Sequence, residues 1–301
     1  MKIVIAGATG LIGGILADRL WNQNHDLTLL SRRPPIENDI PKRRWFAWQP
    51  GFSGEWQNAV NGADGIVNLA GEPIAAKRWN EAQKKRLRSS RLTATASLVD
   101  AIAKADTKPR FLINASAVGY YGARGDEFIN ENAGPGQDFL ARLCVDWENE
   151  AKRAEALGVR VVLLRTGIVL ARGQGALAKM IPPFKVFLGG PLGRGNQWMP
   201  WIHIEDEIGL ITYLIENAEA HGAFNATAPN PVTMKEFSKT LGDVLSRPSW
   251  ARVPASVLAL MLGEMSEMLV NGQRAVPEAA LKSGYVFKYP QLAGALKALN
   301  L

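Results

Sequence analysis

The chain opens with the stretch Lys2-Ile3-Val4-Ile5-Ala6-Gly7-Ala8-Thr9-Gly10-Leu11-Ile12-Gly13, and this stretch decides the fold. Its first residues form a short apolar run rich in β-branched side chains, which is typical of a buried strand. The glycines follow at the spacing GxxGxxG, and apolar residues at 15, 16 and 20 continue with the period of a helix. A second apolar run covers residues 27–30. The predicted order is therefore strand, glycine turn, helix, strand.

This order suits a dinucleotide, because a glycine turn lets the amides at a helix N-terminus approach a pyrophosphate. A glycine triplet alone is a weak signal, and an ordinary strand-to-helix turn is the alternative. The flanking strand and helix favour nucleotide binding. The predicted cofactor contacts in this turn are Gly7, Thr9, Gly10, Leu11, Ile12 and Gly13.

The end of the second apolar run indicates which nucleotide would bind. In NAD-binding proteins a carboxylate about 20 residues beyond the glycines takes the ribose hydroxyl. Here the run ends in Ser31-Arg32-Arg33, and no Asp or Glu stands at that place. A hydroxyl and guanidinium groups suit a 2′-phosphate, because Arg matches phosphate oxygens bidentately. We therefore predict NADP (NADPH), held by Ser31 and Arg32; a solvated basic turn is the alternative.

Strand and helix patterns then alternate through the first half of the chain. Apolar runs cover 44–48, 65–71, 111–115 and 160–164, and long helical patterns cover 80–104 and 138–157. This alternation predicts an α/β fold with a doubly wound parallel sheet. Ligands bind at the carboxyl edge of such a sheet. The exit of the 65–71 run therefore supplies three further predicted cofactor contacts, Leu69, Ala70 and Gly71.

From Gly167 onward the pattern changes, because glycines and prolines, among them Pro182 and Pro183, interrupt the chain into short pieces. This density is typical of a segment that covers a substrate. We predict a nucleotide-binding domain over residues 1–170. A smaller, mostly helical C-terminal substrate lobe would follow over residues 171–301, with a distinct tail from about residue 250.

The composition is that of a soluble globular protein, with 47% hydrophobic residues and a net charge of +7. No zinc-ligand spacing or basic–aromatic alternation accompanies the charge, so a nucleic-acid partner is not expected. The single cysteine, Cys144, fits a reducing compartment, and with three scattered histidines no metal site is expected. The apolar segment 257–270 is too short and too charged to cross a membrane. We expect a cytoplasmic protein with a small-molecule substrate; an oligomer is possible.

Four further stretches carry a family resemblance. They are Ser-Ala-Val-Gly-Tyr-Tyr-Gly at 116–122, Arg-Thr-Gly-Ile-Val-Leu at 165–170, the block at 183–203 and Gly-Gln-Arg-Ala-Val-Pro at 272–277. With the N-terminal motif they resemble the extended short-chain dehydrogenase/reductase superfamily. More narrowly, they resemble an atypical branch, the uncharacterised epimerase-family proteins (NAD-dependent epimerase/dehydratase-like) with their own small C-terminal domain. The resemblance implies an NADP-binding Rossmann fold, a nucleotide-sugar-epimerase-like architecture and no established substrate. It adds Val169 to the predicted cofactor contacts.

The superfamily's catalytic Tyr-x-x-x-Lys signature is missing. On the matching helix the chain reads Phe-Leu-Ala-Arg-Leu at 139–143, with neither the phenol nor the amine that would move a proton. The resemblance places Ser116 where the superfamily keeps a catalytic Ser or Thr. We therefore take Ser116, Tyr120 and Tyr121 as candidate catalytic residues; packing of a loop is the alternative for the two tyrosines.

Several other residues have two open roles. Arg91 on the long helix is a predicted cofactor contact, and both it and Arg165 could hold cofactor phosphate or a substrate anion, or be surface charges. We expect His203 to brace a turn and Asp206 to cap the helix that starts near residue 204. Three apolar residues are expected to pack the two parts together rather than to line a pocket: Trp198, Met199 and Trp201.

Three functions remain open from the sequence. The first is an NADP-dependent oxidoreductase or epimerase-like enzyme that lacks Tyr-x-x-x-Lys. The second is a non-catalytic NADP(H)-binding redox sensor or interaction module, which the missing signature favours. The third, a nucleic-acid-associated protein that uses the basic helix, is the least supported.

Overall fold

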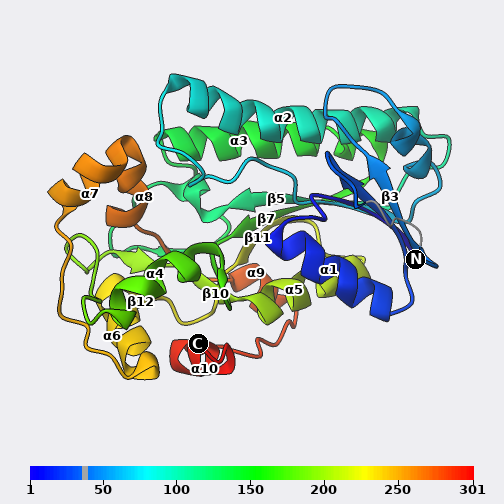
Figure 1. Ribbon diagram of the computed structural model, residues 1–301. Helices are drawn as coiled ribbons and strands as arrows, with labels where there is room; N and C mark the ends of the chain where they lie inside the picture. The colour runs from blue at the N-terminus through cyan, green and yellow to red at the C-terminus, as the bar shows by residue number, and fades with distance from the viewer. Residues whose placement is uncertain (36–39) are drawn as a thin grey trace.

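Seven parallel strands form the central sheet of the computed structural model, which describes residues 1–35 and 40–301. Their order across the sheet is β11-β7-β5-β4-β1-β2-β3 (Figure 1). The strands are β1 (Lys2–Ala6), β2 (Asp26–Ser31), β3 (Arg43–Ala47), β4 (Gly65–Asn68), β5 (Phe111–Ala117), β7 (Arg160–Thr166) and β11 (Gly222–Ala226). The order reverses between β1 and β4, so the predicted doubly wound α/β fold is confirmed.

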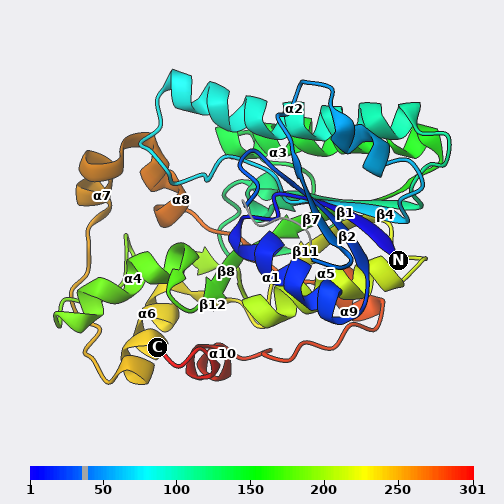
Figure 2. The same ribbon diagram turned by 45° about the vertical axis from the view of Figure 1, so that its right-hand side comes forward.

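Helices cover both faces of the sheet. Helices α2 (Glu81–Lys104) and α3 (Phe139–Lys152) lie on one face, and α1 (Leu11–Asn22) and α5 (Ile204–Glu216) lie on the other (Figures 1 and 2). Alternate residues of β1 enter the two cores, because side chains alternate along a strand. Ile3 and Ile5 are buried against the α1–α5 layer, and Val4 is buried against the α2 layer. Burial on both faces explains the nearly continuous apolar runs of the strands.

Shorter elements gather beyond the carboxyl ends of the strands. Two small strand pairs, β8 (Ile168–Ala171) with β10 (Trp201–His203) and β9 (Trp198–Met199) with β12 (Val232–Thr233), lead into this part. Its helices are α4 (Gly175–Lys185), α6 (Met234–Leu245), α7 (Ala255–Leu262) and α8 (Glu267–Val270). Elsewhere among the described residues, short 3₁₀ turns lie in the connections: η1 (Glu55–Ala59), η2 (Val118–Tyr121), η3 (Glu155–Leu157) and η4 (Gly263–Ser266).

The C-terminal tail runs back from this outer part to the sheet (Figure 1). Strand β13 (Arg274–Ala275) pairs with β6 (Phe128–Ile129), which follows the loop after β5. Helix α9 (Glu278–Lys282) then packs against β11, and α10 (Leu292–Ala298) packs against α6. The tail therefore contacts both the sheet and the outer part.

Strand β11 belongs to the main sheet although it lies beyond residue 170; the division into two domains at that residue stays a prediction. Two local expectations are corrected by the structure. Helix α4 continues through Pro182 and Pro183, whose fixed φ is compatible with a helix, although two amide donors are lost and the rings crowd the carbonyls four residues earlier. The cap of α5 is His203, whose Nδ1 accepts from the amide of Glu205 (3.1 Å), and not Asp206.

Asp206 instead fixes the tail. Its buried carboxylate accepts from the amides of Lys288 (2.7 Å) and Tyr289 (2.9 Å).

In the part of the chain that the structure describes, no helix is long and apolar enough to span a bilayer.

Candidate functional site

The glycine turn brings β1, α1 and the exit of β4 into close contact. Gly7 has a φ of +83°, and a Cβ there would lie 2.8 Å from the Leu69 carbonyl carbon. A Cβ on Gly13 would lie 2.3 Å from the Gly7 carbonyl oxygen. A side chain at Gly7 would push the glycine turn away from the exit of β4, and one at Gly13 would push α1 away from the turn. Gly7 and Gly13 therefore set the approach of the backbones, while Gly10 is exposed at the start of α1.

The N-terminus of α1 fits an anionic group. Gly10 is its N-cap, no side chain caps it, and its first turn holds no acidic residue. The amides of Leu11, Ile12 and Gly13 donate to no acceptor among the described residues. Free amides and the positive end of the helix dipole are what a pyrophosphate requires. The residues present therefore fit a dinucleotide.

The exit of β4 lies beside this turn. Asn68 is fully buried and donates to Asn114 (2.7 Å) and Thr95 (3.0 Å), and its Oδ1 accepts from the amide of Ala70 (3.2 Å). These bonds fix the course of the predicted contacts that follow Asn68: Leu69, Ala70 and Gly71. Because Leu69 also donates its amide to the Ala6 carbonyl (2.9 Å), this exit and the glycine turn form one edge of the site.

Val169 and Arg91 lie at the borders of the same region. A Cβ on Gly175 would lie 3.6 Å from the Val169 carbonyl and 3.5 Å from Leu11, so the start of α4 brings β8 near the glycine turn. The Arg91 guanidinium lies 3.3 Å from the position of a Cβ on Gly71. No ion pair among the described residues involves Arg91, and burial lowers the pKa of its guanidinium. A half-buried cation without a carboxylate suits an anion.

The predicted 2′-phosphate contacts, Ser31 and Arg32, lie at the end of β2. Ser31 is buried, and its Oγ accepts from the amide of Arg33 (3.1 Å). The turn fixed by this bond leaves Arg32 exposed at the carboxyl edge of the sheet. Of the two predicted contacts, Arg32 is thus the one open to a ligand from solvent.

A buried ion pair organises the region after β5. Arg165, on β7, donates from Nε to Glu148 Oε1 (2.8 Å) and from Nη2 to Glu148 Oε2 (2.9 Å). Burial acts against the charge, yet the hydrogen bonds and charge of Glu148 raise the pKa of Arg165 above its usual value. Arg165 is thus neither a surface charge nor available to a ligand phosphate. Sequence reasoning did not single out Glu148; a carboxylate within an otherwise apolar helical stretch was the available signal.

Two of the three candidate catalytic residues belong to this network. Ser116 donates to Glu148 Oε1 (2.7 Å), and Tyr121 donates to Asn225 Oδ1 (2.7 Å) while its hydroxyl accepts from Arg165 Nη1 (3.0 Å). Both side chains are buried. Burial raises the pKa of Tyr121 to about 12, against the influence of the Arg165 charge. Their hydroxyl groups therefore already have protein partners.

Tyr120 differs from both. Its ring lies over the Arg165 guanidinium, with 3.5 Å between the guanidinium carbon and the ring centroid, and packs edge-on against Tyr121. Its hydroxyl makes no hydrogen bond to the residues that the structure describes. Tyr120 is also only half-buried. It is the candidate whose hydroxyl is open to a ligand.

The face of α3 where the signature would stand is apolar. Phe139 stacks edge-on with Trp79 (5.5 Å between centroids), and Leu140 and Leu143 join the same cluster with Met265 from the tail. The next residue, Cys144, has its thiol buried beside Ser116, and burial raises the pKa of this thiol to about 12. An inert thiol thus stands on this face, as expected for a buried structural cysteine.

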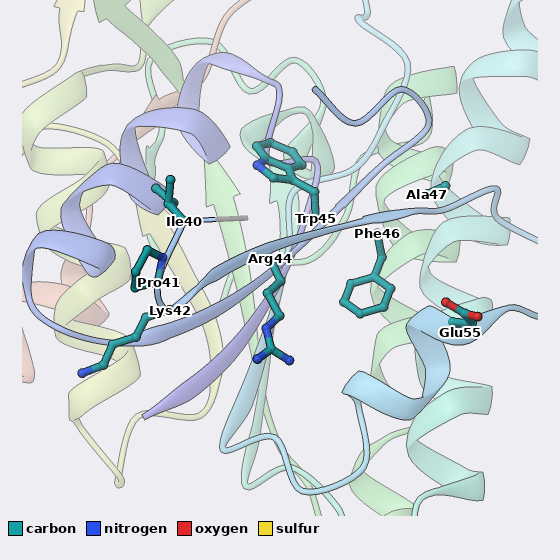
Figure 3. A pocket seen from close by; sticks show the side chains of 8 residues that line it. All are labelled: Ile40, Pro41, Lys42, Arg44, Trp45, Phe46, Ala47 and Glu55. Carbon is teal, nitrogen blue, oxygen red and sulfur yellow. The ribbon is translucent and has the colours of Figure 1, made fainter. Parts of the chain in front are cut away.

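The recess along the sheet edge does not coincide with the predicted site. Among the described residues, no cluster of three His, Cys, Asp or Glu side chains could hold a metal ion. A recess of about 650 Å³ lies along the edge strand β3, with Trp45 on one side of the strand and Arg44 and Phe46 on the other (Figure 3). None of the predicted site residues lines it. Trp198 is half-buried, and Met199 and Trp201 are buried in the core, which fits the expected packing role.

Comparison with known proteins agrees with this geometry. The model of the NAD dependent epimerase/dehydratase family matches residues 3–227, and a domain of unknown function (DUF1731) matches residues 253–299. An epimerase family protein from Arabidopsis thaliana, the chloroplastic SDR39U1 homolog, is 42% identical over 99% of this chain and 86% of its own. The protein YfhF of Bacillus subtilis is 41% identical over 99% of this chain and 98% of its own.

A solved structure is similar over the whole chain. The human epimerase family protein SDR39U1, solved with NADPH, superimposes with a TM-score of 0.87 at 34% sequence identity. The superposition covers 99% of each chain. Both family matches and the full-length similarity agree with the resemblance found in the sequence motifs. This chain belongs to the NAD dependent epimerase/dehydratase family, among the epimerase family proteins that carry the additional C-terminal domain.

Proposed function

We propose that this protein binds NADP(H) and acts as an oxidoreductase or epimerase-like enzyme on a small substrate. The observation that carries the proposal is the uncapped start of α1, held between Gly7 and Gly13 and followed at the end of β2 by Ser31 and Arg32. The human relative solved with NADPH supports the same choice of nucleotide.

Each part of the site then has a role. The amides at the start of α1 bind the pyrophosphate, Arg32 binds the 2′-phosphate from the turn that the Ser31 hydroxyl fixes, and Arg91 adds a cation. The exit of β4 (Leu69, Ala70 and Gly71) and Val169 border the cofactor. NADP(H) supplies or accepts a hydride when it is bound.

Proton transfer in this proposal falls to Tyr120. Among the three candidate hydroxyl groups, that of Tyr120 has no hydrogen-bond partner in the described residues. Tyr120 lies in the turn that follows β5, at the carboxyl edge of the sheet. Ser116 and Tyr121 are positioning residues, because their bonds to Glu148 and Asn225 fix the loop that carries Tyr120. A general acid or base must lie within hydrogen-bond reach of its proton, so a fixed loop is needed.

One observation favours a second candidate, a non-catalytic NADP(H)-binding module. The apolar cluster of Trp79, Phe139, Leu140 and Leu143 occupies the helix face from which a tyrosine and a lysine would act. Such a protein would bind the nucleotide and change its contacts with a partner, without converting a substrate.

The test is a calorimetric titration with NADPH and then with NADH, followed by a screen for turnover. Tight NADPH binding with weak NADH binding is the expected result. Absorbance at the nicotinamide band is then followed with carbonyl compounds and sugar nucleotides. Turnover that Tyr120→Phe removes supports the enzyme; binding without turnover across the screen supports the module. No binding of either nucleotide would overturn both.

A further inference from the structure

An apolar surface lies at the C-terminal end of α4. Helix α4 ends at Lys185, and the next three residues, Val186, Phe187 and Leu188, have exposed fractions of 63%, 55% and 54%. Trp250 is 67% exposed and lies beside them, because its indole Nε1 donates to the Phe187 carbonyl (3.0 Å). We call these four exposed apolar residues the apolar patch. Single exposed apolar side chains are ordinary, but a contiguous group of large ones marks a contact surface.

The backbone holds the apolar patch in place. Residues 186–193 and 247–253 run side by side, and the amide of Ala251 donates to the Gly189 carbonyl (3.0 Å). Phe187 has a φ of +62°, in the left-handed region that bulky residues rarely adopt. This conformation costs free energy, and strained residues of this kind cluster at functional sites. The two segments therefore form a fixed surface that keeps its aromatic side chains in solvent.

Positive charge surrounds the apolar patch. Lys185 is exposed at its border, and the Arg247 guanidinium carbon lies 4.8 Å from the centroid of the Phe187 ring. The sequence contains no Asp or Glu within residues 156–204 or 244–263. Two further cations of these stretches are exposed: Arg194 and Arg252. The carboxylates that flank the two stretches belong to other elements: Glu155, Glu205, Asp243 and Glu264. The segments of the apolar patch thus carry only positive charges.

Helix α7 extends the apolar surface. It contains no charged residue, and its Leu260 and Met261 are 79% and 66% exposed. The chain from α6 to α7, which includes Trp250, runs along the end of the molecule where α7 lies (Figures 1 and 2). Among the described elements α7 packs mainly against the short turn η4. Most of this helix is therefore free to contact something outside the chain.

The charge of this surface decides between possible occupants. In a symmetric dimer the same patch of each copy would face the other, so that Lys185 and Arg247 would meet like charges. An anionic bilayer instead offers negative headgroups to the cations and an apolar boundary to the rings and aliphatic side chains. Lys and Arg can reach headgroups while their stems lie on apolar surface.

We propose that the apolar patch and α7 dock this protein on the surface of an anionic lipid bilayer. Phe187, Leu188, Trp250 and Leu260 enter the boundary between headgroups and acyl chains, and Lys185 and Arg247 contact the headgroups. The protein binds at the surface and does not span the bilayer. This inference is independent of the nucleotide site, because none of these residues belongs to it.

The test is co-sedimentation of the full chain with lipid vesicles. Vesicles of phosphatidylcholine alone are compared with vesicles that also contain anionic phosphatidylglycerol, at low and high salt. The protein should bind the anionic vesicles much more strongly, and added salt should weaken the binding because it screens the charges. Lys185→Gln/Arg247→Gln should weaken the binding about five-fold for each charge removed. The matched control is Lys104→Gln/Lys108→Gln, which removes two exposed charges near the far end of α2.

A second pair of variants tests the apolar contact. Phe187→Asn removes the ring and suits the left-handed backbone, so it should stay folded and weaken vesicle binding about ten-fold or more. Phe52→Asn, at a position of 64% exposure away from the apolar patch, should bind as wild type does. Vesicles with brominated acyl chains should quench Trp250, measured as the difference in fluorescence between wild type and Trp250→Phe.

The outcomes that overturn the proposal are distinct. It is wrong if wild type does not bind the anionic vesicles, or if Phe187→Asn and wild type bind them equally. It is also wrong if the vesicles stay unbound and Phe187→Asn dissociates a dimer seen by analytical ultracentrifugation, since a second copy would then cover the apolar patch. Unfolding midpoints check that each variant is folded. All variants should bind NADPH as wild type does; a wild type that binds vesicles but not NADPH would end the proposed function alone.

Discussion

The guanidinium of Arg165 and the carboxylate of Glu148 form a bidentate ion pair, with N–O distances of 2.8 and 2.9 Å, in which both side chains are buried. This pair joins β7 to α3 and holds Ser116 and Tyr121 through further hydrogen bonds. It lies directly beside the loop after β5, because the ring of Tyr120 packs over the Arg165 guanidinium.

Removal of one partner of this pair should be strongly destabilising. Arg165→Met leaves the Glu148 charge buried without its counter-ion, and we expect a loss of about 3–5 kcal/mol in the free energy of unfolding. The double variant Arg165→Met/Glu148→Leu should lose less than either single variant. Urea unfolding measures all of them. Arg153→Met, which breaks an exposed pair with Asp100, should cost less than about 1 kcal/mol.

The two adjacent tyrosines should respond differently to loss of the hydroxyl. Tyr121→Phe removes the bond to Asn225 and leaves buried polar groups unpaired, so we expect a stability loss of about 1–3 kcal/mol. Tyr120→Phe should leave the free energy of unfolding nearly unchanged, because its hydroxyl has no partner among the described residues. Equal losses in thermal unfolding would contradict the assignment of Tyr121 as the positioning residue.

The glycines of the turn should separate binding from folding. Gly10→Val should abolish NADPH binding while the protein stays folded, since Gly10 is exposed and has an ordinary φ of −80°. Gly13→Ala should lower the unfolding midpoint, because its Cβ would lie 2.3 Å from the Gly7 carbonyl oxygen. Calorimetry and circular dichroism follow the two effects. Gly134→Val is the control, because a Cβ at Gly134 would meet no atom within 4 Å. Normal NADPH binding by Gly10→Val would exclude the turn as the cofactor site.

Arg32 should determine the preference for the 2′-phosphate. Arg32→Ala should weaken NADPH binding by about 1.5–3 kcal/mol, the range of a hydrogen bond to a charged group, and leave NADH binding almost unchanged. Parallel titrations of both nucleotides measure the ratio. Arg86→Ala removes the same charge at another exposed position and should leave the ratio of NADPH to NADH affinity unchanged. Equal weakening of both nucleotides by Arg32→Ala would remove the 2′-phosphate assignment.

Glu207 should make the stability depend on pH. Its carboxyl is fully buried beneath the end of β7, where Thr166 donates to Oε1 (2.9 Å) and Oε2 has no partner among the described residues. Burial raises the pKa of Glu207 from 4.5 to about 8, only partly offset by the bond from Thr166. Between these values the unfolded chain releases the proton and the folded protein keeps it.

The stability that Glu207 contributes is therefore complete at low pH and is lost as the pH rises toward about 8, by about 1.4 kcal/mol per pH unit within that window. Glu207→Gln stays neutral and should lack this dependence. Unfolding free energies of both proteins at pH 5 and pH 8 give the comparison. We expect the variant to gain relative to wild type at the higher pH; a constant difference would show that Glu207 ionises normally.

The sequence by itself determined the elements whose cause is local. The β-branched run, the glycine spacing and the helical period at residues 2–20 predicted β1, the turn and α1, because strand, turn and helix preferences act over neighbouring residues. The order of alternating patterns was enough for a doubly wound sheet, since parallel strands need a crossover helix. Motif spacing also identified the family.

Only the tertiary structure decided which distant residues meet. Asp206 stands in the first turn of α5, and its place suggested a cap, yet its carboxylate binds the amides of Lys288 and Tyr289. In the same way, no local pattern shows that Arg274 lies between Phe128 and Trp198. Such contacts depend on the path by which the tail runs back to the sheet. Long-range packing and hydrogen bonding determine this path, because local propensity carries no information about distant residues.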